Sequence, residues 1–183
     1  MTNYKDDCGG GGFSYPNPRP RRRPIINQTI LACGNGSGLI IPQHNERNSQ
    51  LFNPYVIASV AIDTSDLKKP NVKIDFSCII AFRDNDSDDL RLTFQLVKTT
   101  QFGARIPLGT WNFERDFDDC DEVETVDSFG FTFCECDDCP GCNHYTVELT
   151  NVESEGVDCL SITHPSINAL AVGPLAFDYD DDY

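Results

Sequence analysis

A strict alternation of apolar and polar side chains in residues 90–97 constrains the fold more than any other feature of this sequence. Four apolar residues alternate there with three polar ones, in the order Leu90, Arg91, Leu92, Thr93, Phe94, Gln95 and Leu96. A two-residue period is that of a β-strand with one face in a core and the other toward water. We therefore expect a half-buried antiparallel strand in this segment.

Other segments rich in β-branched and aromatic residues show the same character, and no segment longer than ten residues keeps a 3.6-residue apolar period. The expected strands cover residues 25–33, 55–62, 72–82, 90–97, 106–113, 123–133, 145–152 and 160–163, and residues 167–172 have a less regular pattern. About eight strands separated by short turns predict an all-β chain. We expect a jelly-roll-type β-sandwich with a flexible N-terminal arm.

Two segments between the expected strands predict turns. Residues 34–38 read Gly-Asn-Gly-Ser-Gly, which indicates a turn after the first strand. Residues 83–89 resemble the start of a calcium loop. However, Asp89 and Gln95 stand where an EF-hand needs Gly and Glu, so we expect a polar hairpin turn instead.

The chain of 183 residues suits one domain with tails. Residues 1–24 contain four consecutive glycines and four prolines, which predict a flexible and extended arm or connector. Residues 25–177 form the expected sandwich body, and residues 178–183 form an acidic tail. The arm has a net charge of +3, which leaves −18 for the rest of a chain of net charge −15. This balance argues against nucleic acid and anionic membranes as partners.

The number of cysteines and the N-terminal sequence indicate different cellular compartments. Nine cysteines are typical of an oxidising environment, whereas the first residues contain no apolar stretch of a secretory signal. No apolar run approaches the roughly 18 residues that span a bilayer. Two explanations stay open. The thiols bind metal inside the cell, or the protein is made in a cell that later lyses, such as the mother cell of a spore, and oxidises after release.

Four cysteines gather within nine residues, at Cys134, Cys136, Cys139 and Cys142. Strand-like segments flank them on both sides, so we expect the group at a hairpin tip. Disulfides, within the loop or to another subunit, are the first interpretation. A zinc site with these four thiolates as ligands is the alternative. The spacing does not match the familiar iron–sulfur patterns.

The other cysteines are scattered along the chain. Cys8 lies in the arm, Cys33 ends the first expected strand, and Cys120 and Cys159 lie near strand ends. With the four clustered cysteines they are candidates for structural or inter-subunit disulfides, whose connectivity the sequence leaves open. Cys78 falls on an apolar strand face and is predicted to be a buried thiol.

The sequence offers little for catalysis. His44, His144 and His164 do not lie in a nucleophile or metalloprotease motif, and the paired carboxylates lie in loops. We expect a non-enzymatic protein without a cofactor, or with zinc under the alternative interpretation.

Several stretches resemble a little-characterised clostridial family of cysteine-bearing β-proteins. They are Pro-Ile-Ile at 24–26, Leu-Ala-Cys-Gly at 31–34, and residues 56–65, 70–77, 131–136 and 145–147. Asp66 and Asn71 stand where that family is expected to have cysteines, so one disulfide or metal pair is missing from this chain.

The plan of arm and body is also similar to that of bacterial spore-appendage, or endospore pilus, subunits. The resemblance implies a jelly-roll body, a cysteine-bearing N-terminal connector and synthesis without a signal peptide in the mother-cell cytoplasm. It further implies a homopolymer on the spore surface, with copies of the same chain and other spore-surface proteins as partners. We expect residues 24–33, or the arm before them, to clasp the body of the next subunit.

Overall fold

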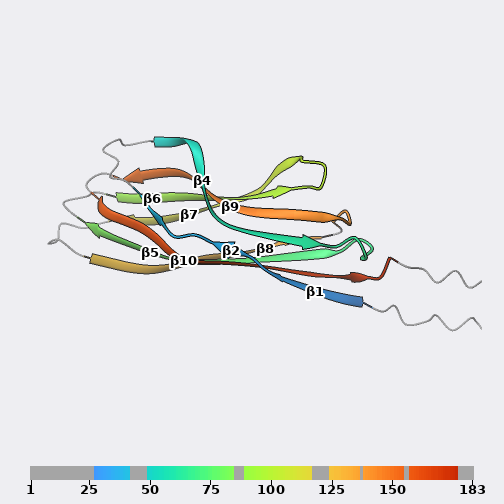
Figure 1. Cartoon of the computed structure of the whole chain (residues 1–183). Coiled ribbons are helices and arrows are strands. Elements are labelled where there is room, and N and C mark those ends of the chain that lie inside the picture. The colour runs from blue at the N-terminus through green and yellow to red at the C-terminus, as the bar shows by residue number, and fades with distance from the viewer. Residues whose placement is uncertain are drawn as a thin grey trace, which may run out of the picture.

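The computed structural model describes residues 27–41, 49–84, 89–116, 124–136, 138–154 and 157–176. These residues form ten strands in two antiparallel sheets that lie one above the other (Figure 1). Within the described ranges, no helix is long and apolar enough to cross a membrane. The prediction of an all-β chain is confirmed, with ten strands in place of about eight.

The two sheets have five strands each. In sheet A the order is β1 (Asn27–Cys33), β10 (Val157–Pro174), β5 (Asn71–Asp84) and β8 (Glu124–Glu135), and the short β3 (Leu39–Ile40) also pairs with β10. In sheet B the order is β2 (Asn35–Gly36), β4 (Ser49–Asp63), β9 (Cys142–Ser154), β6 (Asp89–Thr99) and β7 (Arg105–Asp116). The two expected segments 160–163 and 167–172 are one strand, β10, which is interrupted by register shifts.

The chain changes sheet at almost every connection. Among the described strands, only β6 and β7 follow one another within a sheet. The hairpin turn expected at residues 83–89 is therefore wrong, because β5 lies in sheet A and β6 lies in sheet B. The glycine-rich residues 34–38 are not a simple turn either, since they contain β2. The sheet-to-sheet connections favour a jelly roll, which stays a prediction.

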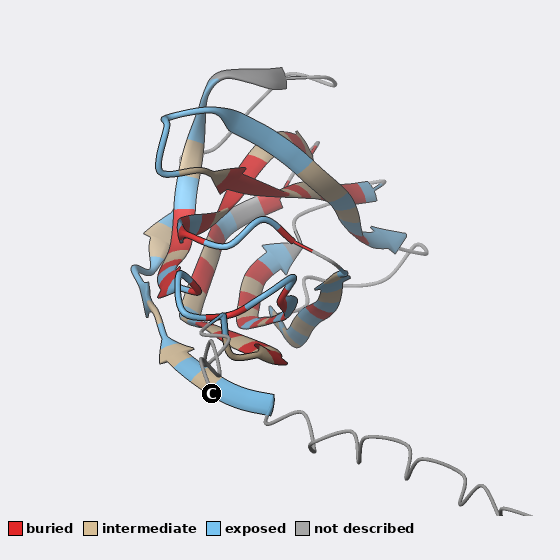
Figure 2. Ribbon diagram, turned by 90° about the vertical axis from the view of Figure 1, so that its right-hand side faces the viewer, coloured by how far each residue is buried: buried red, intermediate tan, exposed pale blue. Residues whose placement is uncertain are grey.

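The core lies between the two sheets. The alternation in β6 is confirmed, because Leu90, Leu92, Phe94 and Leu96 are at most 1% exposed. Figure 2 shows bands of buried, intermediate and exposed residues that alternate along the strands. Alternate residues of each strand supply this core, as the two-residue period requires.

Aromatic side chains join the sheets along the side of the sandwich formed by β7 and β8. Phe129, Phe131 and Phe133 of β8 point inward, as expected for residues on one strand face. The ring of Phe129 stacks on Phe94 of sheet B at a centroid distance of 4.7 Å, and Phe131 lies 5.2 Å from Phe76 of sheet A. Phe113 of β7 meets Phe129 edge-on at a centroid distance of 6.2 Å, so side chains connect the two edge strands β7 and β8.

Candidate functional site

The loop that carries the four clustered cysteines connects the two sheets at one end of the sandwich. It leaves β8 of sheet A after Glu135 and enters β9 of sheet B at Cys142. The expected hairpin tip is therefore wrong, because β8 pairs with β5, whereas β9 pairs with β4 and β6. We call residues 134–142 the cysteine loop. The contacts that hold this loop on the body determine which of its side chains face the solvent.

A buried polar network lies beneath the cysteine loop. Lys98 at the end of β6 is 3% exposed, and its Nζ lies 3.1 Å from both carboxylate oxygens of Glu135. The same Nζ donates to Oδ1 of Asp138. Asn143 donates to Oδ2 of Asp138 at 3.1 Å, and the Tyr145 hydroxyl donates to Glu135 at 3.1 Å. One buried cation therefore serves two carboxylates, of which Asp138 is 5% and Glu135 is 24% exposed, and a partner of such a buried charge is costly to remove.

Tyr145 completes this network from the core side. Its side chain is fully buried, and the Lys98 ammonium lies 5.9 Å from the ring centroid. Burial raises the pKa of Tyr145, and the neighbouring carboxylates of Glu135 and Asp138 raise it further. The phenol consequently keeps its proton and serves as a hydrogen-bond donor to Glu135.

Backbone contacts fix the loop from two more sides. The amide and the hydroxyl of the buried Thr64 both donate to the carbonyl oxygen of Gly141, at 2.9 and 3.1 Å. Gly141 has φ +144, a conformation that L side chains rarely adopt. The Asp138 amide donates to the carbonyl of Pro70 at 2.9 Å. These bonds hold the loop against the segment that joins β4 to β5.

The thiols of the cysteine loop do not converge. Cys134 is exposed on β8, where it pairs with Lys73, while the following Glu135 points inward. Cys142 is exposed on β9, where the following residue is buried, so it faces outward from the other sheet. Within the described residues, no group of three or more His, Cys, Asp or Glu side chains could hold a metal ion. The geometry therefore gives the zinc alternative no support.

The remaining cysteines lie in different places. Cys33 and Cys159 are exposed thiols, and Cys159 has φ 56 at an irregularity of β10. Cys78 is 3% exposed in the core, as predicted, and burial raises the pKa of its thiol to about 12. The seven cysteines that the structure describes are all free thiols. Cys8 and Cys120 lie outside the described residues.

Strand β1 begins at the same end of the sandwich as the cysteine loop. Asn27 pairs with Pro174 at the end of β10, and β10 continues the sheet toward the first residues of β5 and the last residues of β8. Figure 1 shows the start of β1, the end of β10 and the start of β9 at one end of the molecule. The segment with Cys8 is joined to the body at this end, through Asn27.

Strand β1 is an edge strand with little buried surface. Among the described strands it pairs with β10 alone, and five of its seven side chains are exposed. Ile30 and Ala32 are partly buried against the core, whereas Leu31 is 66% exposed. Such a strand is held chiefly by its backbone hydrogen bonds, which a copy of the same strand could replace.

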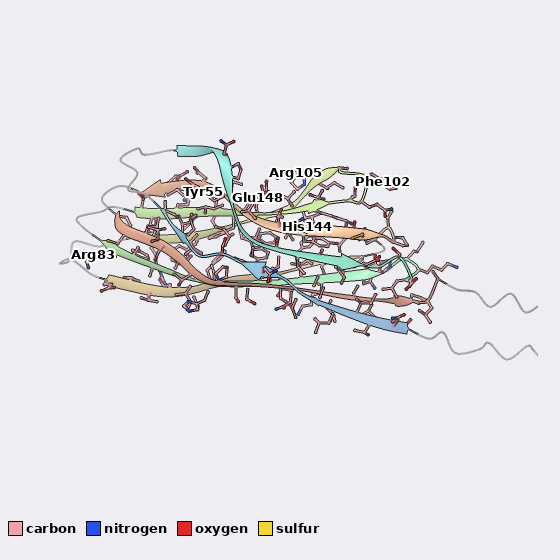
Figure 3. The ribbon with its side chains drawn as sticks, in the orientation of Figure 1. Tyr55, Arg83, Phe102, Arg105, His144 and Glu148 are labelled. Atoms are coloured by element: carbon pink, nitrogen blue, oxygen red, sulfur yellow. The ribbon has the colours of Figure 1, made fainter. Side chains whose placement is uncertain are left out.

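Sequence reasoning also missed a buried carboxylate away from this network, that of Glu148 on the outer face of sheet B (Figure 3). Glu148 of β9 is 5% exposed, and Arg105 of β7 donates to its carboxylate at 2.6 Å. Thr146 donates to the same oxygen at 3.4 Å. The strand alternation places Glu148 on the outer face, where a solvent-exposed side chain is expected. Only the structure shows that neighbouring strands cover it.

The fold and the site define an all-β protein of two antiparallel sheets, with a cysteine-bearing connection between them. The chain belongs to the DUF4489 family, described as a domain of unknown function, which matches residues 27–172. No curated protein matches the sequence. The solved structure of Eiger TNF from S. frugiperda is similar to this chain at 12% sequence identity and a TM-score of 0.42. That likeness covers 85% of this chain and 99% of the other, and it establishes neither fold nor function.

Proposed function

We propose that this protein is a non-enzymatic structural subunit that self-assembles into an extracellular filament or spore-surface appendage. The observation that carries the proposal is the position of β1, an exposed edge strand that adjoins the arm at the end where the cysteine loop lies. In the assembly, β1 of one subunit pairs with β10 of the next. Each subunit then gives a strand and accepts one, so the contact is heterologous and propagates into a filament.

The exchange of β1 costs little in contacts, because the strand forms the same seven backbone pairs with a second copy of β10. Only Ile30 and Ala32 have to leave one core and enter another. The positive arm and the negative body attract each other across the new contact, which accelerates docking at low salt. The partners are copies of the chain and other spore-surface proteins, with neither nucleic acid nor membrane involved.

Disulfides then lock the joint. Eighteen residues lie between Cys8 and Asn27, so an extended arm spans up to about 60 Å and reaches the cysteine loop of a neighbour. Cys134, Cys136, Cys139 and Cys142 are all exposed and ready to pair with a thiol from another subunit. Cys33, Cys120 and Cys159 are further candidates. Oxidation takes place after the mother cell has lysed, which requires no secretory signal.

A strand-locking experiment tests the exchange of β1. Thr29 and Val172 face each other across β1 and β10, so the T29C/V172C variant should close a disulfide within the monomer. We expect dilute, oxidised double variant to stay as single particles by negative-stain electron microscopy, and to form filaments after a reductant is added. The T29C single variant is the matched control and should assemble like the wild type. Normal filaments from the locked monomer would refute strand exchange.

A truncation tests the arm separately. Protein without residues 1–24 should fold into a soluble body that no longer polymerises, because it lacks Cys8 and the positive arm. Comparing oxidised and reduced full-length protein then shows whether disulfides hold the joints. Uniform small particles from both full-length samples would exclude autonomous assembly, and normal polymers from the truncated protein would exclude a role for the arm.

A further inference from the structure

We infer that Lys98 and Asp138 condense into an intramolecular isopeptide bond, with Glu135 as the proton carrier. The side chains of Lys98 and Asp138 are 4% and 5% exposed and are in direct contact. Glu135 contacts the same ammonium through both of its oxygens, at 3.1 Å each. An amine, a carboxyl group and a second carboxylate in one buried place are the reactants and the acid–base catalyst that amide formation needs. The inference is independent of the proposed function.

The donors around Asp138 suit an attack on its carboxyl carbon. The Cys139 amide donates to Oδ1 at 2.7 Å, and the Asn143 side chain donates to Oδ2 at 3.1 Å. Both donors are held in place before the reaction, so they stabilise the negative charge that develops on oxygen in the tetrahedral intermediate. Asn143 is 4% exposed, and its hydrogen bond to Oδ2 persists when that oxygen becomes the amide carbonyl.

The step balances without an external reagent. The Lys98 ammonium gives one proton to Glu135, and the free amine attacks the Asp138 carbonyl carbon. Glu135 passes that proton to Oδ1 and then carries a second proton from the attacking nitrogen to the same oxygen. The bond between the carbon and Oδ1 breaks, one water molecule leaves, and a neutral amide remains.

The burial of the pair favours the product. A buried ammonium and a buried carboxylate each carry a desolvation cost, and the amide removes both charges at once. Glu135 keeps its charge, its hydrogen bond from Tyr145 and its partial access to solvent, at 24% side-chain exposure. The bond joins the end of β6 to the cysteine loop, so the loop stays on the body even when its hydrogen bonds open.

Mass spectrometry of the full-length protein, reduced and alkylated, tests the bond. The folded wild type should be lighter than its sequence by the mass of one water molecule. Trypsin should fail to cleave after Lys98, and the peptide that contains Lys98 should be linked to the one that contains Asp138. An unmodified mass, or a loss of water that maps elsewhere, would overturn the inference and leave an ion pair.

Three variants assign the roles. K98R keeps the positive charge but cannot form the bond, and E135Q removes the proton carrier, so both should have the full mass. K73R changes the exposed Lys73–Asp75 pair, which has an N–O distance of 2.9 Å, and should keep the loss of water. Circular dichroism checks that each variant is folded. A bond that still forms in E135Q would overturn the role of Glu135, and one that survives K98R would overturn the site.

Discussion

The indole of Trp111 on β7 and the ring of Phe131 on β8 stack face to face, with ring centroids 3.8 Å apart and an interplanar angle of 4°. The two rings come from different sheets and join the edge strands of the sandwich. Because Phe131 is 9% exposed and Trp111 is partly buried, this pair shields the adjacent core from water.

Replacement of Trp111 by alanine should lower the free energy of unfolding by about 2–4 kcal/mol, somewhat less than for a fully buried tryptophan. W111F should retain part of the stacking and lose less. Denaturant unfolding followed by circular dichroism measures both. F102A is the control, because Phe102 is 88% exposed in the β6–β7 turn and should contribute almost nothing (Figure 3). Equal losses in F102A and W111A would contradict a specific role for the stack.

Replacement of Lys98 by methionine should lower the free energy of unfolding by about 3–5 kcal/mol, because the carboxylates of Glu135 and Asp138 are then left without the Lys98 nitrogen that each of them contacts. Guanidinium unfolding of the two proteins gives the difference. K73M is the matched control. Lys73 pairs with Asp75 at the surface, where a salt bridge is worth little, so this variant should unfold like the wild type. A K98M protein as stable as K73M would show that the network does not anchor the loop.

Replacement of Gly34 by alanine should destabilise the fold by about 1–3 kcal/mol or more, through overpacking where the chain crosses from sheet A to sheet B. A Cβ at this position would lie 2.2 Å from the Ser59 carbonyl oxygen and 2.6 Å from the Ile167 side chain. G38A is the milder comparison, with its nearest atom at 3.2 Å. Thermal unfolding of both variants should rank G34A well below G38A, and the reverse order would exclude close packing as the cause.

Burial raises the folded-state pKa of Cys78 to about 12, from an ordinary value of 9.0. The unfolded thiol ionises first as the pH rises, so its contribution to stability is complete below about pH 9 and is lost between the two pKa values. The free energy of unfolding should therefore fall in this range, by up to about 1.4 kcal/mol per pH unit.

The measurement for Cys78 is denaturant unfolding at about pH 8 and about pH 10.5. Tyr145 also has a raised pKa and contributes to the alkaline loss, so C78A should keep part of the slope. In folded wild-type protein at neutral pH, iodoacetamide should label the six exposed thiols that the structure describes and leave Cys78 unmodified. Rapid labelling of Cys78 before unfolding would contradict its burial.

The strands could be predicted from the sequence wherever burial and alternation coincide. Residues 90–97 show this, because each apolar side chain of the pattern lies in the core between the sheets. The burial of Cys78 and the inward positions of the β8 phenylalanines were predicted for the same reason. The pairing of strands was not predictable, because two alternating strands have the same pattern whether a hairpin joins them within one sheet or a connection carries the chain to the other sheet. The cysteine loop was placed at a hairpin tip for that reason.

The polar network also escaped sequence reasoning, although one signal was present. Lys98 continues the core-facing positions of Leu92, Phe94 and Leu96, so the two-residue period places it inward. A lysine there requires a buried partner. Its partners, Glu135 and Asp138, lie about 40 residues away in an acidic segment that is typical of a solvated loop. Only the fold brings these residues together.

The pairing of β1 with β10 has a consequence for the order of events during synthesis. Asn27 meets Pro174, so the first described strand cannot complete its sheet until almost the whole chain has left the ribosome. Contacts between residues so far apart in sequence form slowly, because a long loop must close first. During that interval β1 lacks its partner strand, while β10 can already pair with β5 on its other side. Under the proposed strand exchange, the joints between subunits would form in this interval, before β1 of each chain has closed on its own β10.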